Sequence, residues 1–185
     1  MASLPNTKLV TYEEWLQMPE VSEGIEEVVN GEIQILPAPK WKPATIIENL
    51  RNLMAPQIDR QLVRIAVSQF GLVIPKRPLI TRVPDLAVFE RSSIVERDGY
   101  IQSAPQWIVE VLSPANRREE REGKLADYAS IGVAEVWVIS PEARTVEILV
   151  LEGSALRRLT IVADGVLRPV RFPYVAIDIA SIWTV

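Results

Sequence analysis

The sequence predicts an α/β (α+β) protein with a mixed β-sheet flanked by helices and with additional antiparallel hairpins. Apolar runs rich in β-branched and aromatic residues lie on both sides of a long stretch with helical spacing, and a second helical segment separates two of the later runs. Strands, helices and strands in that order are typical of a mixed sheet with helices on its faces. The 185 residues, 48% of them hydrophobic, suit one core. We expect a disordered start over residues 1–10 and a single domain over residues 11–185.

Local signals predict the elements of the first third of the chain. Thr11–Glu14 matches a capping box and predicts a short helix. Asn30-Gly31 lies between apolar runs and predicts a hairpin over Ile25–Leu36. Apolar residues at helical spacing predict one long helix from about Ala44 to Leu62, which Pro56 should kink or split.

Most of the remaining chain reads as strands joined by turns. The turn-prone stretch Pro75–Pro84 separates two strands, and residues 92–104 are charged and irregular. Asn116 is expected to cap a helix that runs through Ala129, and Asp178 should cap a last helical turn. The predicted strands are Val63–Val67, Gly71–Ile74, Leu86–Phe89, Ile108–Leu112, Glu135–Ile139, Thr145–Leu151 and Leu156–Val162.

The composition excludes several kinds of chemistry. The chain has no histidine and no cysteine, which excludes Ser-His-Asp and Cys-His catalysis and most zinc sites. A bound metal must therefore be held by oxygen atoms, which favours Mg²⁺ or Mn²⁺. No run has the roughly 18 uncharged apolar residues of a membrane helix, and the absence of cysteine fits a cytoplasmic protein. The net charge of −4 counts against DNA as a partner but does not exclude a local basic face.

Glu110 is a carboxylate inside the apolar run Gln106–Leu112. An ionised carboxylate in an apolar interior costs several kcal/mol unless a partner compensates it. Asp85 stands at the mouth of another apolar run, and if the two strands pair, both carboxylates reach one edge of the sheet. Two such carboxylates repel unless a cation lies between them. The residues therefore predict a divalent-metal site, with the backbone carbonyl of Val111 as a third oxygen ligand.

Lys124 lies two to three turns into the helix that follows the Glu110 strand. Its side chain could reach back over the end of that strand. There an ammonium group would stabilise the charge that develops on a phosphate or help to orient the attacking water.

Each of these residues also has a simpler interpretation. Asp85 follows a proline and could be a turn former, and Glu110 could face water from an edge strand. Lys124 could be a solvated residue paired with Glu120 one helical turn earlier. The Arg117–Arg121 cluster, with its interleaved glutamates, could be a solvated helix face rather than a set of phosphate contacts.

Six segments considered together point to a known family. They are Thr11–Leu16, Glu27–Glu32, Val83–Val88, Pro105–Pro114, Lys124–Ala129 and Gly132–Ile139. They resemble the Uma-type family of putative restriction endonucleases, whose members belong to the PD-(D/E)XK nuclease-like superfamily. The resemblance runs through nearly the whole chain.

The resemblance implies a restriction-endonuclease-like core, in which at least four strands form a mixed helix-flanked sheet with the site at one end. Asp85 matches the aspartate of the superfamily motif and Glu110 its second acid. The motif's lysine would stand two residues after that acid, where this chain has Leu112, and in this family it maps to Lys124. Glu27 matches an acid that completes such a site.

Three functions are compatible with these residues. The first is a homodimeric, Mg²⁺- or Mn²⁺-dependent endonuclease that hydrolyses DNA, with Arg117, Arg118 and Arg121 as candidate phosphate contacts. The second is a catalytically silent DNA- or protein-binding module on the same fold. The third is a hydrolase of nucleotides or RNA that uses the same residues.

Overall fold

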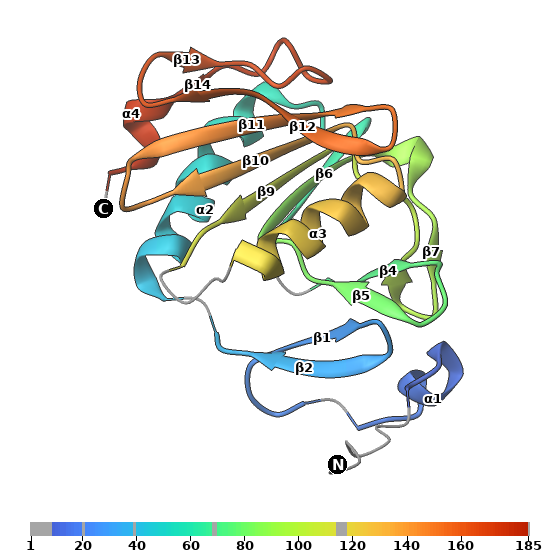
Figure 1. Cartoon of the computed structure of the whole chain (residues 1–185). Coiled ribbons are helices and arrows are strands. Elements are labelled where there is room, and N and C mark those ends of the chain that lie inside the picture. Colours follow the sequence, from blue (N-terminus) through green and yellow to red (C-terminus); the bar gives the residue numbers. More distant parts are fainter. Residues whose placement is uncertain (1–8, 20, 39, 68–69, 114–117, 185) are drawn as a thin grey trace.

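The computed structural model describes residues 9–19, 21–38, 40–67, 70–113 and 118–184 (Figure 1). Residues 1–8 of the expected disordered start lie outside the described residues. Val10 is already fixed, because its amide donates to the carbonyl of Gly31 at 2.8 Å. The expected helix cap Asn116 also lies outside the described residues.

A six-stranded mixed sheet forms the centre of the molecule. Its order is β12-β11-β10-β9-β6-β3; β9 and β10 run parallel, and the other neighbours run antiparallel. The bounds are β3 Val63–Val67, β6 Leu86–Glu90, β9 Trp107–Val111, β10 Glu135–Ser140, β11 Thr145–Glu152 and β12 Ala155–Val162. This is the mixed sheet that the sequence predicts.

Two helices cover the two faces of this sheet (Figure 1). The helix α2 (Trp41–Met54) places Leu50 and Met54 against Trp107 and Trp137 in one core. The helix α3 (Arg118–Ser130) lies on the opposite face, where its apolar residues join a second core with β6, β9 and β10. Alternate residues of each central strand therefore enter different cores, which explains the nearly continuous apolar runs in the sequence.

A second six-stranded sheet lies beside α3 and has the order β2-β1-β5-β4-β8-β7. Its strands are β1 Ile25–Val29, β2 Glu32–Leu36, β4 Leu72–Ile74, β5 Ile80–Arg82, β7 Glu96–Arg97 and β8 Tyr100–Ile101. The short helix α1 (Tyr12–Leu16) packs on it through Trp15. At the other end of the molecule, β13 (Val166–Leu167) pairs with β14 (Ile177–Asp178), and α4 (Ile179–Ile182) follows.

Several local predictions are confirmed. Thr11 caps α1 with a complete capping box that includes Glu14. Asn30 and Gly31 have φ of 52° and 81°, as the tight turn between β1 and β2 requires. Asp178 caps α4 by accepting a hydrogen bond from the amide of Ala180.

Two predictions of local structure are wrong. The helix expected to reach Leu62 ends at Met54 and continues only as a 3-10 turn over Ala55–Gln57; the break at Pro56 is as expected, but no helix follows it. Leu62 is 66% exposed and belongs to no helical stripe. The turn-prone stretch Pro75–Pro84 contains β5, a buried strand of 3 residues that is too short to show a period of two.

Glu135 is a buried carboxylate that joins the central sheet to the C-terminal segment. It accepts hydrogen bonds from the indole nitrogen of Trp137 and from the amide of Val170, both at 2.6 Å. Both partners are donors, so the site requires two acceptor oxygens. The ring of Trp137 in turn packs edge-on against Trp107, with ring centroids 4.6 Å apart.

We therefore expect Glu135→Gln to destabilise the protein, because the amide nitrogen of glutamine would face a buried donor. The expected loss is about 1–3 kcal/mol in the free energy of unfolding, measured by urea denaturation. Glu152→Gln, at an exposed position of β11, is the control with the same change. Equal stability of the two variants would contradict the account of Glu135.

Candidate active site

Glu110 lies on β9, in the middle of the central sheet between β6 and β10. The interpretation as an edge residue that faces water is therefore wrong. The pairing of Leu86 with Val109, continued by one residue, places Asp85 opposite Glu110. The carboxylate of Asp85 accepts a hydrogen bond from the amide of Val111 at 2.7 Å, which holds it against β9. The two acids thus lie next to each other at the same end of β6 and β9, as the sequence predicts.

Lys124 projects from α3 into the space between the two sheets. Its Nζ lies 3.2 Å from Oε1 of Glu27 and 3.3 Å from Oε2 of Glu110. Its side chain is only 13% exposed. The interpretation of Lys124 as a solvated helix residue is therefore wrong. The structure brings together all four residues proposed from the sequence, one from each of β1, the start of β6, β9 and α3.

Arg82 on β5 was not recognised from the sequence, although it is the most enclosed cation of the site. Its guanidinium donates to Glu27 at 2.8 Å and to one oxygen of Asp127 at 2.9 and 2.7 Å. Glu27 also accepts a hydrogen bond from the amide of Val83 at 3.0 Å. Both oxygens of Glu27 are thus bound by other groups of the chain. Glu27 therefore positions Arg82 and Lys124.

Tyr128 was also missed, because its position on α3 reads as an ordinary core residue. Its hydroxyl donates to Oε1 of Glu110 at 2.5 Å. Lys124, Asp127 and Tyr128 are spaced three and four residues apart, which places them on one face of the helix. This spacing was the available signal. We call Glu27, Arg82, Asp85, Glu110, Lys124 and Asp127 the ion network.

Burial and mutual repulsion change the protonation of the network. Burial raises the pKa of Glu110 to about 7, with a further contribution from the charge of Asp85 and against the effect of Lys124. Burial also raises the pKa of Asp85. For Lys124, burial alone would lower the pKa, but Glu110, Glu27 and Asp85 outweigh it and hold the pKa above its ordinary value. Lys124 is therefore a permanent positive charge rather than a base.

A small pocket opens beside the network. Glu110, Val111, Glu120, Arg121 and Lys124 are among the residues that line it, and its volume is about 20 Å³. A space of about this size holds one water molecule or ion rather than an organic molecule.

The oxygen atoms at this place fit a hard divalent cation. Among the described residues, no three acidic side chains are arranged to enclose a cation on their own. The set expected from the sequence is smaller: the pair of Asp85 and Glu110, with the backbone of Val111 beside it. Such a pair suits Mg²⁺ or Mn²⁺, since Mg²⁺ usually binds through one or two carboxylates and keeps several waters.

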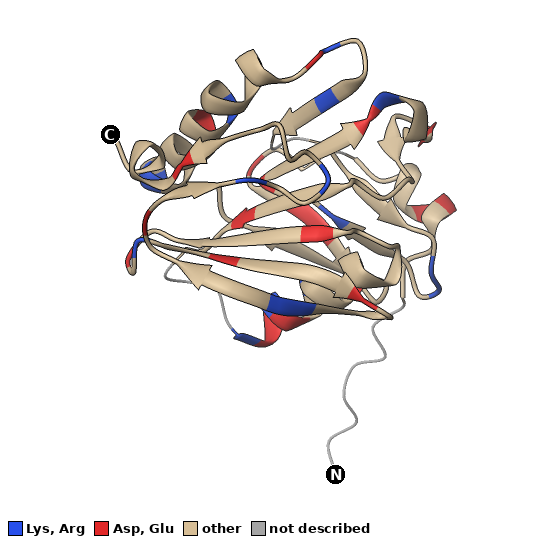
Figure 2. Cartoon of the chain, turned by 90° about the horizontal axis from the view of Figure 1, so that it is seen from above, with Lys and Arg blue, Asp and Glu red and all other residues tan. Residues whose placement is uncertain are grey.

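Of the arginines proposed as phosphate contacts, Arg121 lines the small pocket beside Lys124, but the described arginines have acidic partners. Arg121 is paired with Glu147, and Arg118 with Glu122 at 2.7 Å. Arg117 lies outside the described residues. In the part of the chain that the structure describes, basic and acidic positions are intermixed rather than gathered on opposite sides (Figure 2).

The chain is similar to putative nucleases in fold and in sequence pattern. The crystal structure of a putative nuclease belonging to DUF820 from Anabaena variabilis ATCC 29413 superposes with a TM-score of 0.77 at 22% identity, covering 94% of this chain and 97% of that one. This likeness shows a shared fold. No curated protein matches the chain. The model of the Uma2 family, described as putative restriction endonuclease, matches residues 12–179. Because that match spans most of the sequence, the chain belongs to the Uma2 family of putative restriction endonucleases.

Proposed function

We propose that the chain is a metal-dependent endonuclease that hydrolyses DNA phosphodiester bonds. The observation that carries the proposal is the meeting of Asp85, Glu110 and Lys124 at the same end of β6 and β9, beside a small pocket. The family membership supports the same class of activity.

The charges of the ion network support the binding of one divalent cation. Counted as ionised, four carboxylates face two cations, which leaves an excess of two negative charges within a largely buried space. Asp85, Glu110 and the backbone carbonyl of Val111 would hold Mg²⁺ or Mn²⁺. When bound, the ion would polarise a phosphate oxygen and lower the pKa of a bound water.

The chain's own residues then have separate tasks. Lys124 carries a fixed positive charge toward the phosphate and offsets the charge that develops there. Tyr128 holds one oxygen of Glu110 in place through its hydroxyl. Glu27 binds Lys124 and Arg82, so it positions the lysine without contacting the substrate itself.

A catalytically silent DNA- or protein-binding module is the second candidate. The observation that favours it is that both oxygens of Glu110 already have partners, Tyr128 and Lys124. Calorimetric titration with Mg²⁺ and Mn²⁺ separates the two functions. A folded protein that gives no heat of binding with either ion would support the silent module and contradict the nuclease.

A homodimer would allow two such sites to meet one duplex. The edge strand β12 exposes Leu159 and Ile161, which are 61% and 48% accessible. Exposed apolar residues on an unpaired edge favour contact with a second copy. Sedimentation equilibrium should therefore give about twice the 20.8 kDa of the chain. A single-chain mass at all concentrations would contradict the dimer.

We expect Asp85→Asn to abolish divalent-ion-dependent cleavage of DNA while the protein stays folded. The amide oxygen of asparagine still accepts the hydrogen bond from Val111, but the negative charge for the cation is lost. Cleavage of plasmid DNA in Mg²⁺ and in Mn²⁺ measures activity, and circular dichroism measures folding. Asp164→Asn, at an exposed turn, is the control. Undiminished cleavage by Asp85→Asn would contradict the assignment.

We expect Tyr128→Phe to weaken the binding of the divalent ion rather than to abolish activity. The ring is fully buried and phenylalanine preserves its packing, so the change removes only the hydrogen bond to Glu110. Loss of such a supporting contact costs about 10–100-fold in metal affinity or activity. The Mg²⁺ concentration at half-maximal cleavage should rise for Tyr128→Phe and stay unchanged for Tyr174→Phe. Equal values for the two variants would refute this role of Tyr128.

A further inference from the structure

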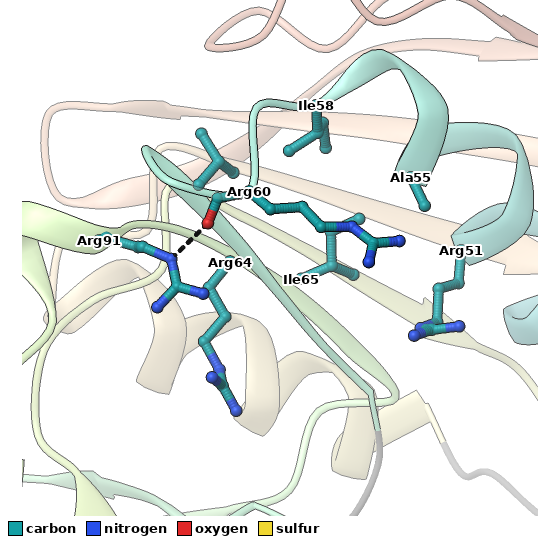
Figure 3. A pocket seen from close by; sticks show the side chains of 8 residues that line it. Arg51, Ala55, Ile58, Arg60, Arg64, Ile65 and Arg91 are labelled. Carbon is teal, nitrogen blue, oxygen red and sulfur yellow. Dashed lines mark hydrogen bonds between the residues drawn. The ribbon is translucent and has the colours of Figure 1, made fainter.

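Four arginines surround one pocket that lies away from the ion network. Arg51 belongs to α2, Arg60 to the segment before β3, Arg64 to β3, and Arg91 to the 3-10 turn after β6. The pocket has a volume of about 280 Å³. Figure 3 shows these side chains around it, with the Nε of Arg91 bonded to the carbonyl of Arg60 at 2.7 Å.

These arginines differ from those beside α3 in having no acidic partner. In the described part of the chain, none of the four forms an ion pair, whereas Arg118 and Arg121 each do. The contrast is marked in a chain whose net charge is −4. Surface arginines in an acidic protein readily find carboxylates, so a group of four without one is a local concentration of uncompensated positive charge.

The pocket combines this charge with an apolar floor. Ala55, Ile58, Val63 and Ile65 line it together with the arginines. A guanidinium is weakly hydrated and binds a phosphate through two parallel hydrogen bonds. The floor offers contact to the sugar that joins two phosphates. The lining therefore suits successive units of a phosphodiester chain better than a single inorganic ion.

The position of the pocket relates it to the proposed active site. β3 is an edge strand of the central sheet. Glu90, which precedes Arg91, pairs with Val63, whereas Asp85 stands at the opposite end of β6. The five residues of β6 separate the two places by roughly 17 Å at the rise of a strand.

We propose that Arg51, Arg60, Arg64 and Arg91 form a binding surface for the backbone of a nucleic acid strand. The surface holds phosphates at a distance from the bond that is cut. It supplies affinity without reading sequence, because contacts to phosphates carry no base information. The relation of this surface to a cut bond rests on the proposed nuclease function, whereas the binding of nucleic acid does not.

The test measures DNA binding without cleavage. Fluorescence anisotropy follows a labelled duplex titrated with the full chain in the absence of divalent ions, over a series of salt concentrations. Arg51→Gln/Arg64→Gln removes two of the charges and leaves the hydrogen bond between Arg91 and Arg60 intact. Arg77→Gln/Arg97→Gln is the matched control, because it removes two exposed arginines elsewhere.

The expected result is that the slope of log K against log salt falls by about two in magnitude for Arg51→Gln/Arg64→Gln and is unchanged for the control. DNA binding with equal slopes in both variants would overturn the surface and leave the nuclease proposal intact. Binding that depends on the cluster in a protein that never cleaves would contradict the nuclease alone.

A second measurement separates the ligand classes. Thermal unfolding is followed with a short oligonucleotide and with inorganic phosphate at equal phosphate concentration. We expect the oligonucleotide to stabilise the wild-type chain more strongly than phosphate does, and this difference to disappear in Arg51→Gln/Arg64→Gln. Equal stabilisation by both ligands would show a site for a small anion and overturn the nucleic acid surface.

Discussion

The buried guanidinium of Arg82 is the constraint on which the rest of the site depends. An arginine removed from water must be paired on all sides, and Arg82 binds Glu27 of β1 and Asp127 of α3 at once. This ties the N-terminal hairpin, β5 and α3 into one body (Figure 1). Because α3 is fixed in this way, Lys124, one turn before Asp127, must face the end of β9. The position of Lys124 therefore depends on the salt bridge between Arg82 and Asp127.

The same arrangement divides the acids into two kinds. Glu27 and Asp127 both bind Arg82 and serve to hold the elements together. Glu110 lines the small pocket and Asp85 lies beside Glu110, and burial raises the pKa of both. A divalent cation between these two acids would offset their repulsion when both are ionised. The chain uses paired charges for structure here, whereas the arginines around Arg64 on β3 have no acidic partner among the described residues.

Much of the site could be predicted because a charge in an apolar strand is conspicuous. Glu110 and Asp85 stand out for this reason, and the register of β6 and β9 brings them together. Lys124 could be assigned only through the family resemblance, since a lysine on a charged helix is usually solvated. Arg82 escaped notice because β5 has 3 residues between proline-rich turns. Its role depends on the packing of β1 against α3, which is a long-range contact that no local pattern encodes. A break near Pro56 could likewise be predicted from the sequence, whereas the residues against which α2 packs could not, because those contacts are also long-range.

The central claim is that Asp85 and Glu110 form the ligand pair of one divalent cation. A crystal structure with Mn²⁺, with the ion located by its anomalous scattering, tests this most directly. The account predicts a single strong peak within coordination distance of one carboxylate oxygen of Asp85 and one of Glu110, with Lys124 still bound to Glu27. A peak held by other residues, or none at this pair at saturating Mn²⁺, would contradict it.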